Sequence, residues 1–335
     1  IFGNIDNIMG NEAKPFLSKT NPLNISKSDG EHFSLKYLLP YYWPTWLLLV
    51  LSFLIAFMPN IIRVILGNIV GKIIFLMNSK RRNIVMANLS LCFKSKTKTE
   101  VSNICKAYFF YLGRAFVDMS LLWWRSNPFL QKNCEISNQE YIDKALSKNK
   151  GIILLVAHSV FLDFGGRSLS RYPMVSMYKP FRNKLLNWVI GSARSRKTDN
   201  IIVYPRDNFP FRKIIKALRK KAIFYYLGDE DLGKDNSVFS NFFDEKKSTL
   251  ISISKISKLS SCVVMPCVNY YCPISKKYKT YIGKPLDDFP SNDKQKDADT
   301  INIALQKVIS RDLEQYMWSL RLFQTRPDGK SYPYK

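Results

Sequence analysis

The chain has 335 residues, of which 46% are hydrophobic and 14% aromatic, so it can bury the core of one large or two ordinary domains. This composition excludes an intrinsically disordered chain. Lys and Arg number 51 against 26 Asp and Glu, which gives a net charge of +25. A positive field of this size favours anionic partners: nucleic acid, anionic lipid headgroups, phosphorylated substrates or an acidic protein.

The N-terminal part divides into a polar stretch and an apolar one. Residues 1–36 are polar, with scattered Gly, Asn, Ser and Pro, and predict a poorly ordered extension. Residues 37–62 carry no charged side chain and exceed the length of about 20 apolar residues that a membrane span needs. Their apolar side chains lie all round a helix rather than on one stripe, which favours a transmembrane helix over a buried core helix. Aromatic residues gather at one end, as in an interfacial belt: Tyr41, Tyr42, Trp43 and Trp46.

Positive charge follows this stretch more densely than it precedes it. The positive-inside rule therefore places the bulk of the chain, residues 63–335, in the cytoplasm. Residues 61–77 are apolar with isolated charges and fit a second, shallow anchor in the membrane interface.

Cysteine and histidine usage argues against a metal centre. The six cysteines include no CxxC pair, and His32 and His158 are the only histidines. A Cys/His zinc site is therefore poorly supplied, and we expect neither a metal nor a cofactor. Nothing in the cysteine spacing suggests a secretory disulfide framework, which favours a reducing compartment.

The body of the chain changes its pattern near residue 124. From about residue 80 to 124, apolar side chains recur with the helical period and predict packed helices. Beyond that point, short apolar runs alternate with helical stretches. This alternation predicts an α/β fold with a largely parallel sheet flanked by helices. No internal repeat or long linker divides the region, so we expect one domain over residues 63–335.

The stretch "GIILLVAHSVFLDFGG", residues 151–166, places His158 directly after an apolar run, with Asp163 five positions later. Catalytic groups of α/β sheets gather at the carboxyl ends of strands, so we expect His158 at such an edge and Asp163 where the next helix begins. A carboxylate that keeps one imidazole nitrogen protonated leaves the other free to take a proton from a hydroxyl. The pair therefore fits general base catalysis, while a structural strand-end histidine and an N-cap aspartate fit the same spacing.

"VAHSVFLD" resembles the H-x4-D/E motif of glycerolipid and lipid A acyltransferases. From about residue 37 to the end of the chain, further stretches resemble the late acyltransferases of lipid A biosynthesis, the lauroyl and myristoyl transferases, in their order and at their spacing. These stretches are "YYWPTWLLLVLSFLIAFMP", "SKRRNIVMANLSLCF", "YKPFRNKLLNWV", "IIKALRKKAIFYYLGDEDLG", "SVFSNFF" and "EQYMWSLRLFQTRPDG".

The resemblance implies a glycerolipid acyltransferase-like fold and transfer of an acyl chain, lauroyl-type favoured, from acyl carrier protein. The implied acceptor is a hydroxyl of a 3-hydroxyacyl chain on a phosphorylated, Kdo-bearing lipid A precursor. Carried over to this chain, His158 is the general base and Asp163 its orienting partner. The resemblance also implies a single-pass protein of the Gram-negative inner membrane, with its catalytic domain on the cytoplasmic face and in contact with membrane lipid.

The same resemblance assigns substrate-binding residues. The "YKPFRN" block has Lys179 where relatives carry Arg, a change that keeps the charge and loses the bidentate fork suited to phosphate. Basic positions downstream match the family's site for the phosphorylated acceptor, and acids of "GDEDLG" are expected either to orient the arginines or to form a turn. The expected substrate-binding residues are Tyr178, Lys179, Asn183, Arg194, Arg196, Arg206, Asp229 and Asp231.

Two alternatives are open at this stage. A glycerophosphate or lysophosphatidate acyltransferase shares the H-x4-D motif, although "YKPFRN" and "EQYMWSLRLFQTRP" argue against it. A non-catalytic, membrane-tethered basic protein that binds nucleic acid or lipid needs neither His158 nor Asp163. Its Lys and Arg residues would form runs or an aromatic-lined groove, whereas those of this chain are dispersed, so we expect no nucleic-acid partner.

Overall fold

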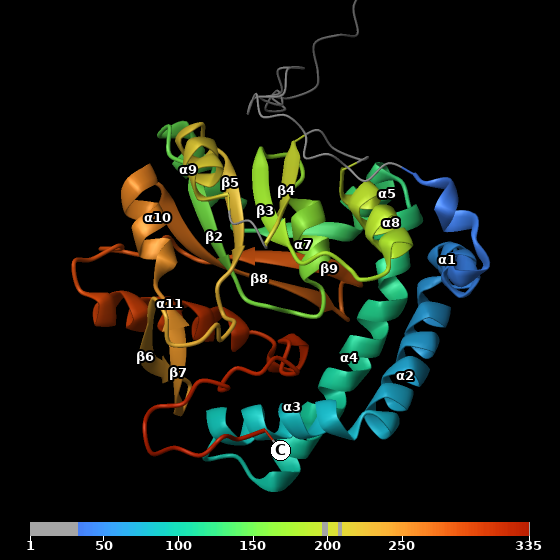
Figure 1. Cartoon of the computed structure of the whole chain (residues 1–335), viewed down its shortest axis with the longest axis horizontal. Helices are drawn as coiled ribbons and strands as arrows, with labels where there is room; N and C mark the ends of the chain where they lie inside the picture. The colour runs from blue at the N-terminus through green and yellow to red at the C-terminus, as the bar shows by residue number, and fades with distance from the viewer. Residues whose placement is uncertain (1–32, 196–199, 207–209, 335) are drawn as a thin grey trace, which may run out of the picture.

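The computed structural model describes residues 33–195, 200–206 and 210–334. An arm of N-terminal helices lies along one side of an α/β domain (Figure 1). The helices are α1 (Trp43–Ala56), α2 (Asn60–Met77), α3 (Ser79–Cys92), α4 (Lys98–Trp124), α5 (Asn127–Asn133), α6 (Gln139–Ser147), α7 (Leu162–Ser168), α8 (Lys184–Ser195), α9 (Phe211–Arg219), α10 (Ser252–Ser260) and α11 (Lys294–Ile309), with short 3-10 turns η1 (Leu35–Leu38), η2 (Pro40–Tyr42) and η3 (Leu313–Gln315). The strands are β1 (Cys134–Ser137), β2 (Ile152–Val156), β3 (Met174–Tyr178), β4 (Ile201–Pro205), β5 (Ile223–Leu227), β6 (Ser237–Phe242), β7 (Glu245–Leu250), β8 (Val263–Cys272) and β9 (Lys277–Ile282).

Seven strands form one sheet in the order β1-β9-β8-β2-β5-β3-β4, and β6 pairs with β7 in a separate hairpin. Neighbours in the large sheet are parallel except β8 and β9. The central strand β2 is buried on both faces, which explains its unbroken apolar sequence. On one face Ile153 and Leu155 join the core beneath α3, α4, α9 and α11, and on the other Ile152 and Leu154 pack with α6. The predicted α/β fold with a largely parallel sheet is confirmed.

The helix expected over residues 37–62 is interrupted, so its predicted bounds were wrong. Pro40 begins the turn η2, α1 runs for only 14 residues, and Pro59 precedes a second helix. Proline has no amide hydrogen to donate within a helix, a constraint that a measure of hydropathy does not register. At about 1.5 Å per residue, α1 is shorter than the roughly 30 Å of a bilayer's hydrocarbon core.

Helix α2 takes up the region expected to be a shallow anchor. Its 18 residues have a mean hydropathy of 1.8, which is long and apolar enough to cross a membrane by length and composition alone. It packs along α4 through glycines, because a Cβ on Gly113 would lie 2.2 Å from the backbone nitrogen of Gly71. The buried carboxylate of Asp118 accepts hydrogen bonds of 3.0 Å from the Nε atoms of Arg63 on α2 and Arg114 on α4. The outer face of α2 exposes apolar residues: Ile61, Ile65, Ile69, Ile73 and Leu76.

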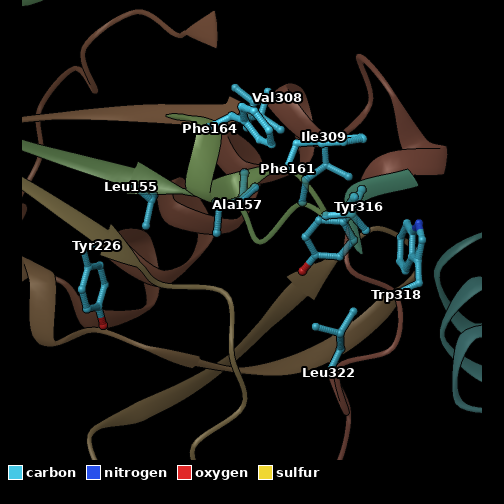
Figure 2. Packing of buried hydrophobic residues seen from close by; sticks show 14 of the residues in the cluster. Leu155, Ala157, Phe161, Phe164, Tyr226, Val308, Ile309, Tyr316, Trp318 and Leu322 are labelled. Carbon is cyan, nitrogen blue, oxygen red and sulfur yellow. The ribbon is translucent and has the colours of Figure 1, made fainter. Parts of the chain in front are cut away.

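The C-terminal segment, residues 313–334, packs against both α3 and the loop after β2. Asn88 of α3 donates to the carbonyls of Trp318, at 2.6 Å, and Leu320, at 2.7 Å. Figure 2 shows Tyr316 and Trp318 of this segment beside Phe161 from the loop after β2. The motifs "NLSLCF" and "EQYMWSLRLF" therefore meet in space although more than 200 residues separate Asn88 from Trp318.

Candidate active site

His158 lies two residues beyond the end of β2, at the carboxyl edge of the sheet, as its position after an apolar run predicts. The loop that carries it is held by the C-terminal segment. The amide of Met317 donates to the carbonyl of His158 at 2.9 Å, and the amide of Val160 donates to the carbonyl of Gln315 at 3.0 Å. The His158 side chain is buried.

Asp229 holds this histidine through two contacts. Strand β5 is parallel to β2 and next to it, so the residues that follow the two strands meet at the same edge. One carboxylate oxygen of Asp229 accepts a 2.8 Å hydrogen bond from the backbone amide of His158, and the other contacts Nδ1 of its ring. A carboxylate at Nδ1 keeps the proton on that nitrogen and leaves Nε2 as the acceptor.

The electrostatics of the pair follow from its burial. Burial lowers the pKa of His158, but the Asp229 carboxylate and, more weakly, Glu230 outweigh this effect, so the pKa lies above its ordinary value. Burial raises the pKa of Asp229, but His158 outweighs it and holds the pKa below its usual range. Lys247 of β7 is fully buried nearby, and its positive charge also lowers the pKa of Asp229. Asp229 is therefore ionised at neutral pH.

Glu230 faces the other ring nitrogen. Its Oε1 lies 3.7 Å from Nε2 of His158, and its Oε2 accepts a 2.6 Å hydrogen bond from Arg206. Two carboxylates thus flank the imidazole of His158, Asp229 at Nδ1 and Glu230 near Nε2, and Arg206 lies beyond Glu230. Glu230 is not among the substrate-binding residues expected from the sequence, although it stands in the same "GDEDLG" stretch as Asp229.

Asp163 lies in the first turn of α7 and lines the same cavity as His158. The start of α7 is fixed by Tyr225, whose hydroxyl donates to the carbonyl of Leu162 at 2.9 Å and accepts from Asn269 at 2.7 Å. The carboxylate that contacts Nδ1 of His158 is that of Asp229. The role of Asp163 as orienting partner of His158 stays a prediction.

A cavity of about 1190 Å³ runs across this edge of the sheet and contains His158, Asp163, Arg206 and Glu230 in its wall. Its lining includes residues of α4 and of α10, two helices that lie apart in Figure 1. Apolar side chains line the part near α4, and serine and lysine line the part near α10. The apolar residues include Met119, Leu122, Trp123, Phe181 and Ile190, and the polar ones include Ser252, Ser254, Lys255, Lys258 and Lys294.

The residues expected to bind substrate fall into four groups, three of which are the following. Tyr178, Lys179 and Arg206 line the cavity with His158. Asp229 instead contacts the imidazole directly. Arg194 lies on α8 with its side chain outside the described part of the structure, and Arg196 lies outside the described residues altogether.

Two of the expected residues have structural partners. Asn183 caps α8 by accepting a 3.1 Å hydrogen bond from the amide of Leu186, and it donates to Thr45 of α1 at 2.8 Å. Asp231 accepts from the amides of Gly233, at 3.1 Å, and Thr325, at 2.6 Å, which ties its turn to the C-terminal segment. Among the described residues, no group of three or more His, Cys, Asp and Glu is placed to hold a metal ion.

Comparison with known proteins places the chain among acyltransferases. Residues 31–325 match the family described as bacterial lipid A biosynthesis acyltransferase. A lipid A biosynthesis acyltransferase of Haemophilus influenzae is 33% identical over 301 residues, covering 89% of this chain and 93% of that protein. The lipid A biosynthesis palmitoleoyltransferase of Escherichia coli is 29% identical over 90% of this chain and 98% of its own length. The lauroyltransferase of the same organism is 28% identical over 89% and 96%.

Among solved structures, the 1-acyl-sn-glycerophosphate acyltransferase of Thermotoga maritima matches 70% of this chain and 97% of its own, with a TM-score of 0.31 and 14% identity.

Proposed function

Because this chain belongs to the bacterial lipid A biosynthesis acyltransferase family, we propose that it adds a secondary acyl chain to a phosphorylated, Kdo-bearing lipid A precursor. In this proposal acyl carrier protein supplies the chain as a thioester, and a hydroxyl of a 3-hydroxyacyl chain on the precursor accepts it. The observation that carries the proposal is the contact between Asp229 and Nδ1 of His158 in the wall of the large cavity.

The chemistry follows from the two ring nitrogens of His158. Asp229 keeps the proton on Nδ1, so Nε2 takes the proton of the acceptor hydroxyl as that oxygen attacks the thioester carbonyl. An oxygen–carbon bond forms and the carbon–sulfur bond breaks. The imidazolium then returns the proton to the leaving thiolate, which leaves the ring neutral for the next cycle. Asp229 stabilises the transient positive charge on the ring throughout.

Asp163 enters the proposal as a second carboxylate on the cavity wall. The resemblance assigns it the orienting role, and Asp229 has the geometry for that role at Nδ1. Replacement of each carboxylate by its amide distinguishes the two, because loss of the residue that holds Nδ1 should change the pKa of the base more than loss of the other.

The basic wall of the cavity suits the phosphates of the acceptor. Arg206, Lys179 and Tyr178 lie together at the ends of β3 and β4. Arg206 is partly exposed and hydrogen-bonded to Glu230, so it is held near Nε2 of His158 while it remains accessible to an anion. Arginine binds phosphate through parallel hydrogen bonds, which would place the acceptor hydroxyl relative to the base.

The apolar wall near α4 suits the acyl chain of the donor. Met119, Leu122 and Trp123 supply apolar surface on the side of the cavity opposite to the lysines of α10. We propose a lauroyl-type donor from the overall sequence resemblance. The names of the relatives include both palmitoleoyl and lauroyl transferases, so the chain length requires a direct test.

Helices α1 and α2 are the proposed membrane contact. Both expose apolar side chains to the surroundings, including Trp43 and Leu47 of α1 and Ile65 and Ile69 of α2. We propose that this surface enters the inner membrane from its cytoplasmic side, with α2 as the candidate single span and the α/β domain in the cytoplasm.

The function is tested with membranes that contain the full chain, a panel of acyl carrier protein thioesters and a Kdo-bearing lipid A precursor. We expect transfer from at least one thioester, and the most efficient donor gives the chain length. Acylation of glycerol 3-phosphate or lysophosphatidate in place of the lipid A precursor would contradict the proposed acceptor. Transfer from acyl-coenzyme A alone would contradict the proposed donor.

A further inference from the structure

Helices α9 and α10 contact each other and together form a strongly basic face. Their sequences and the two residues after α9 contain no Asp or Glu. The buried side of α9 is apolar, with Ile214, Ala217 and Leu218, so its cations all point outward. The exposed basic residues of this face are Arg212, Lys213, Lys216, Arg219, Lys220, Lys221, Lys255 and Lys258. We call these eight residues the basic face.

Three cations of this face have no acidic partner among the described residues. Arg212, Lys216 and Lys255 form no ion pair with any residue that the structure describes. Arg219 donates to the carbonyl of Leu259 at 2.7 Å, and Lys258 donates to Asn292 at 3.3 Å, so the contacts of these two are with neutral groups. An anionic partner would therefore meet a concentrated positive field.

The basic face is continuous with the cavity that holds His158. Lys255 and Lys258 belong to both, because they lie on α10 and also line the cavity beside Ser252 and Ser254. A thioester on a flexible arm that enters past α10 would reach the His158 ring from a partner bound outside. The hydroxyls and ammonium groups along this entrance suit a phosphate on that arm.

The position of the basic face in the molecule selects the kind of partner. In Figure 1, α9 and α10 lie at the left of the molecule, while α1 and α2, with their exposed apolar residues, lie at the right, beyond α4. A membrane that receives α1 and α2 therefore leaves α9 and α10 facing away from it. The headgroups of that membrane would then lie far from the basic face, whereas a soluble acidic protein can reach this face.

We propose that the basic face is the docking surface for the acidic acyl carrier protein, which delivers its thioester into the cavity past Lys255 and Lys258. The proposal rests on the proposed function, in which acyl carrier protein is the donor. It assigns separate entrances to the two substrates, with the lipid acceptor entering from the side of α1 and the carrier protein from the side of α10.

The test reverses two charges of the basic face that do not line the cavity, in the double variant Arg212→Glu and Lys216→Glu. Both side chains are exposed on α9, so the fold should tolerate the change. The matched control is the double variant Lys148→Glu and Lys150→Glu, which makes a change of the same sign at exposed positions next to the amino end of β2. Steady-state transfer is measured for the full chain in detergent, with acyl carrier protein thioester and, separately, with acyl-phosphopantetheine as donor.

We expect the α9 variant to raise the KM for the acyl carrier protein thioester about tenfold at low ionic strength, with the difference shrinking as salt screens the charges. Its kcat, its KM for acyl-phosphopantetheine and its KM for the lipid acceptor should equal those of the unmodified chain and of the control. An unchanged KM for the carrier protein thioester would overturn the proposal. So would an equal rise in the KM for acyl-phosphopantetheine, or a rise confined to the lipid acceptor, which would identify a lipid-binding surface.

The proposed function and the docking surface fail in different ways. If the unmodified chain transfers no acyl group from carrier protein but uses another thioester, the donor assignment fails and the docking surface fails with it. If the unmodified chain uses the carrier protein and the α9 variant uses it equally well, only the docking surface fails.

Discussion

Asp229 binds His158 twice, once at the backbone amide through a 2.8 Å hydrogen bond and once at Nδ1 of the ring. The two contacts hold the main chain and the imidazole against one fully buried carboxylate. Because Asp229 follows β5 and His158 follows β2, the pair depends on the parallel pairing of these two strands. The tautomer of the proposed base is thus set by the topology of the sheet.

Replacing Asp229 with asparagine should change the dependence of the rate on pH. The base must be neutral to take a proton, so kcat/KM of the unmodified chain should fall as the pH drops through the His158 pKa, which lies above its ordinary value of 6.5. Without the carboxylate, burial of the ring dominates and lowers that pKa, so the acidic limb should move to lower pH. The rate itself should fall by about 10² or more, because the ring is no longer held as the Nε2 acceptor. Rates of transfer measured from pH 5 to 9 give both quantities.

Asp163→Asn is the matched comparison for this variant. We expect it to lower the rate while moving the acidic limb less than Asp229→Asn does. The opposite order would assign the orienting role to Asp163, as the sequence resemblance implies.

Arg206→Ala should weaken binding of the phosphorylated acceptor. Loss of a charge-assisted contact to phosphate predicts a rise in KM for the lipid precursor of about tenfold or more, with a smaller change in the KM for the donor. Arg206→Lys should recover part of the affinity, since lysine keeps the charge but not the paired hydrogen bonds. Arg171→Ala, at an exposed position before β3, serves as the control. An unchanged acceptor KM in Arg206→Ala would remove this residue from the site.

Glu245→Gln should destabilise the fold in a way that depends on pH. The Glu245 carboxylate contacts Lys330 and lies 3.3 Å from Lys94 and 3.6 Å from Arg326, which joins β7 to the C-terminal segment. Burial raises its pKa, but the contact with Lys330, the hydrogen bond from the backbone amide of Lys246 and the contact with Lys94 outweigh it and lower the pKa to about 2. A folded-state pKa below the unfolded value contributes stability above about pH 4.5 that is lost as the pH falls towards 2. The variant should therefore lose about 1 to 2 kcal/mol of the free energy of unfolding at pH 7.

Denaturant unfolding of both proteins in detergent, repeated at decreasing pH, measures this difference. The difference in the free energy of unfolding between the unmodified chain and Glu245→Gln should narrow below pH 4.5. A difference that stays constant down to pH 3 would rule out the ionised carboxylate as its cause.

Gly113→Ala should loosen the packing of α2 on α4. A Cβ at this position would lie 2.3 Å from the carbonyl oxygen of Gly67, and backbone atoms on both sides leave no room for relaxation except by moving a helix. Overpacking of this kind costs about 1 to 3 kcal/mol. Gly191→Ala on α8 is the control, since its Cβ would meet nothing within 4 Å and alanine favours a helix. Thermal unfolding should show a lower Tm for Gly113→Ala only; equal Tm values would contradict the tight helix contact.

The sequence predicted those features of the site that depend on local pattern. An apolar run followed by histidine located His158 at a strand end, and the alternation of strands and helices gave the parallel sheet. The partner of His158 could not be predicted from local sequence pattern. Asp229 is 71 residues away and meets His158 only through the pairing of β2 with β5. Asp229 was expected to bind substrate, and Glu230 was considered only as one of the acids of the "GDEDLG" stretch.

Two other differences have local causes. Hydropathy indicated one long helix over residues 37–62, but Pro40 and Pro59 divide that stretch into turns, a short helix and the start of a second one. Asn183 is expected to bind substrate because it stands in a motif, and this stays a prediction; in the structure its side chain caps α8 and bonds to Thr45. A short polar side chain before a helix serves as an N-cap as readily as it binds a ligand, and the sequence does not separate these uses.

The most direct test of the proposed chemistry is single-turnover acyl transfer from acyl carrier protein thioester to the Kdo-bearing lipid A precursor, measured for the unmodified chain and for His158→Ala. Loss of a positioned base predicts a rate lower by about 10² to 10⁴, with the same Tm and the same affinity for the lipid acceptor. If His158→Ala transfers the acyl chain at the rate of the unmodified protein, His158 is not the general base and the proposed mechanism is wrong.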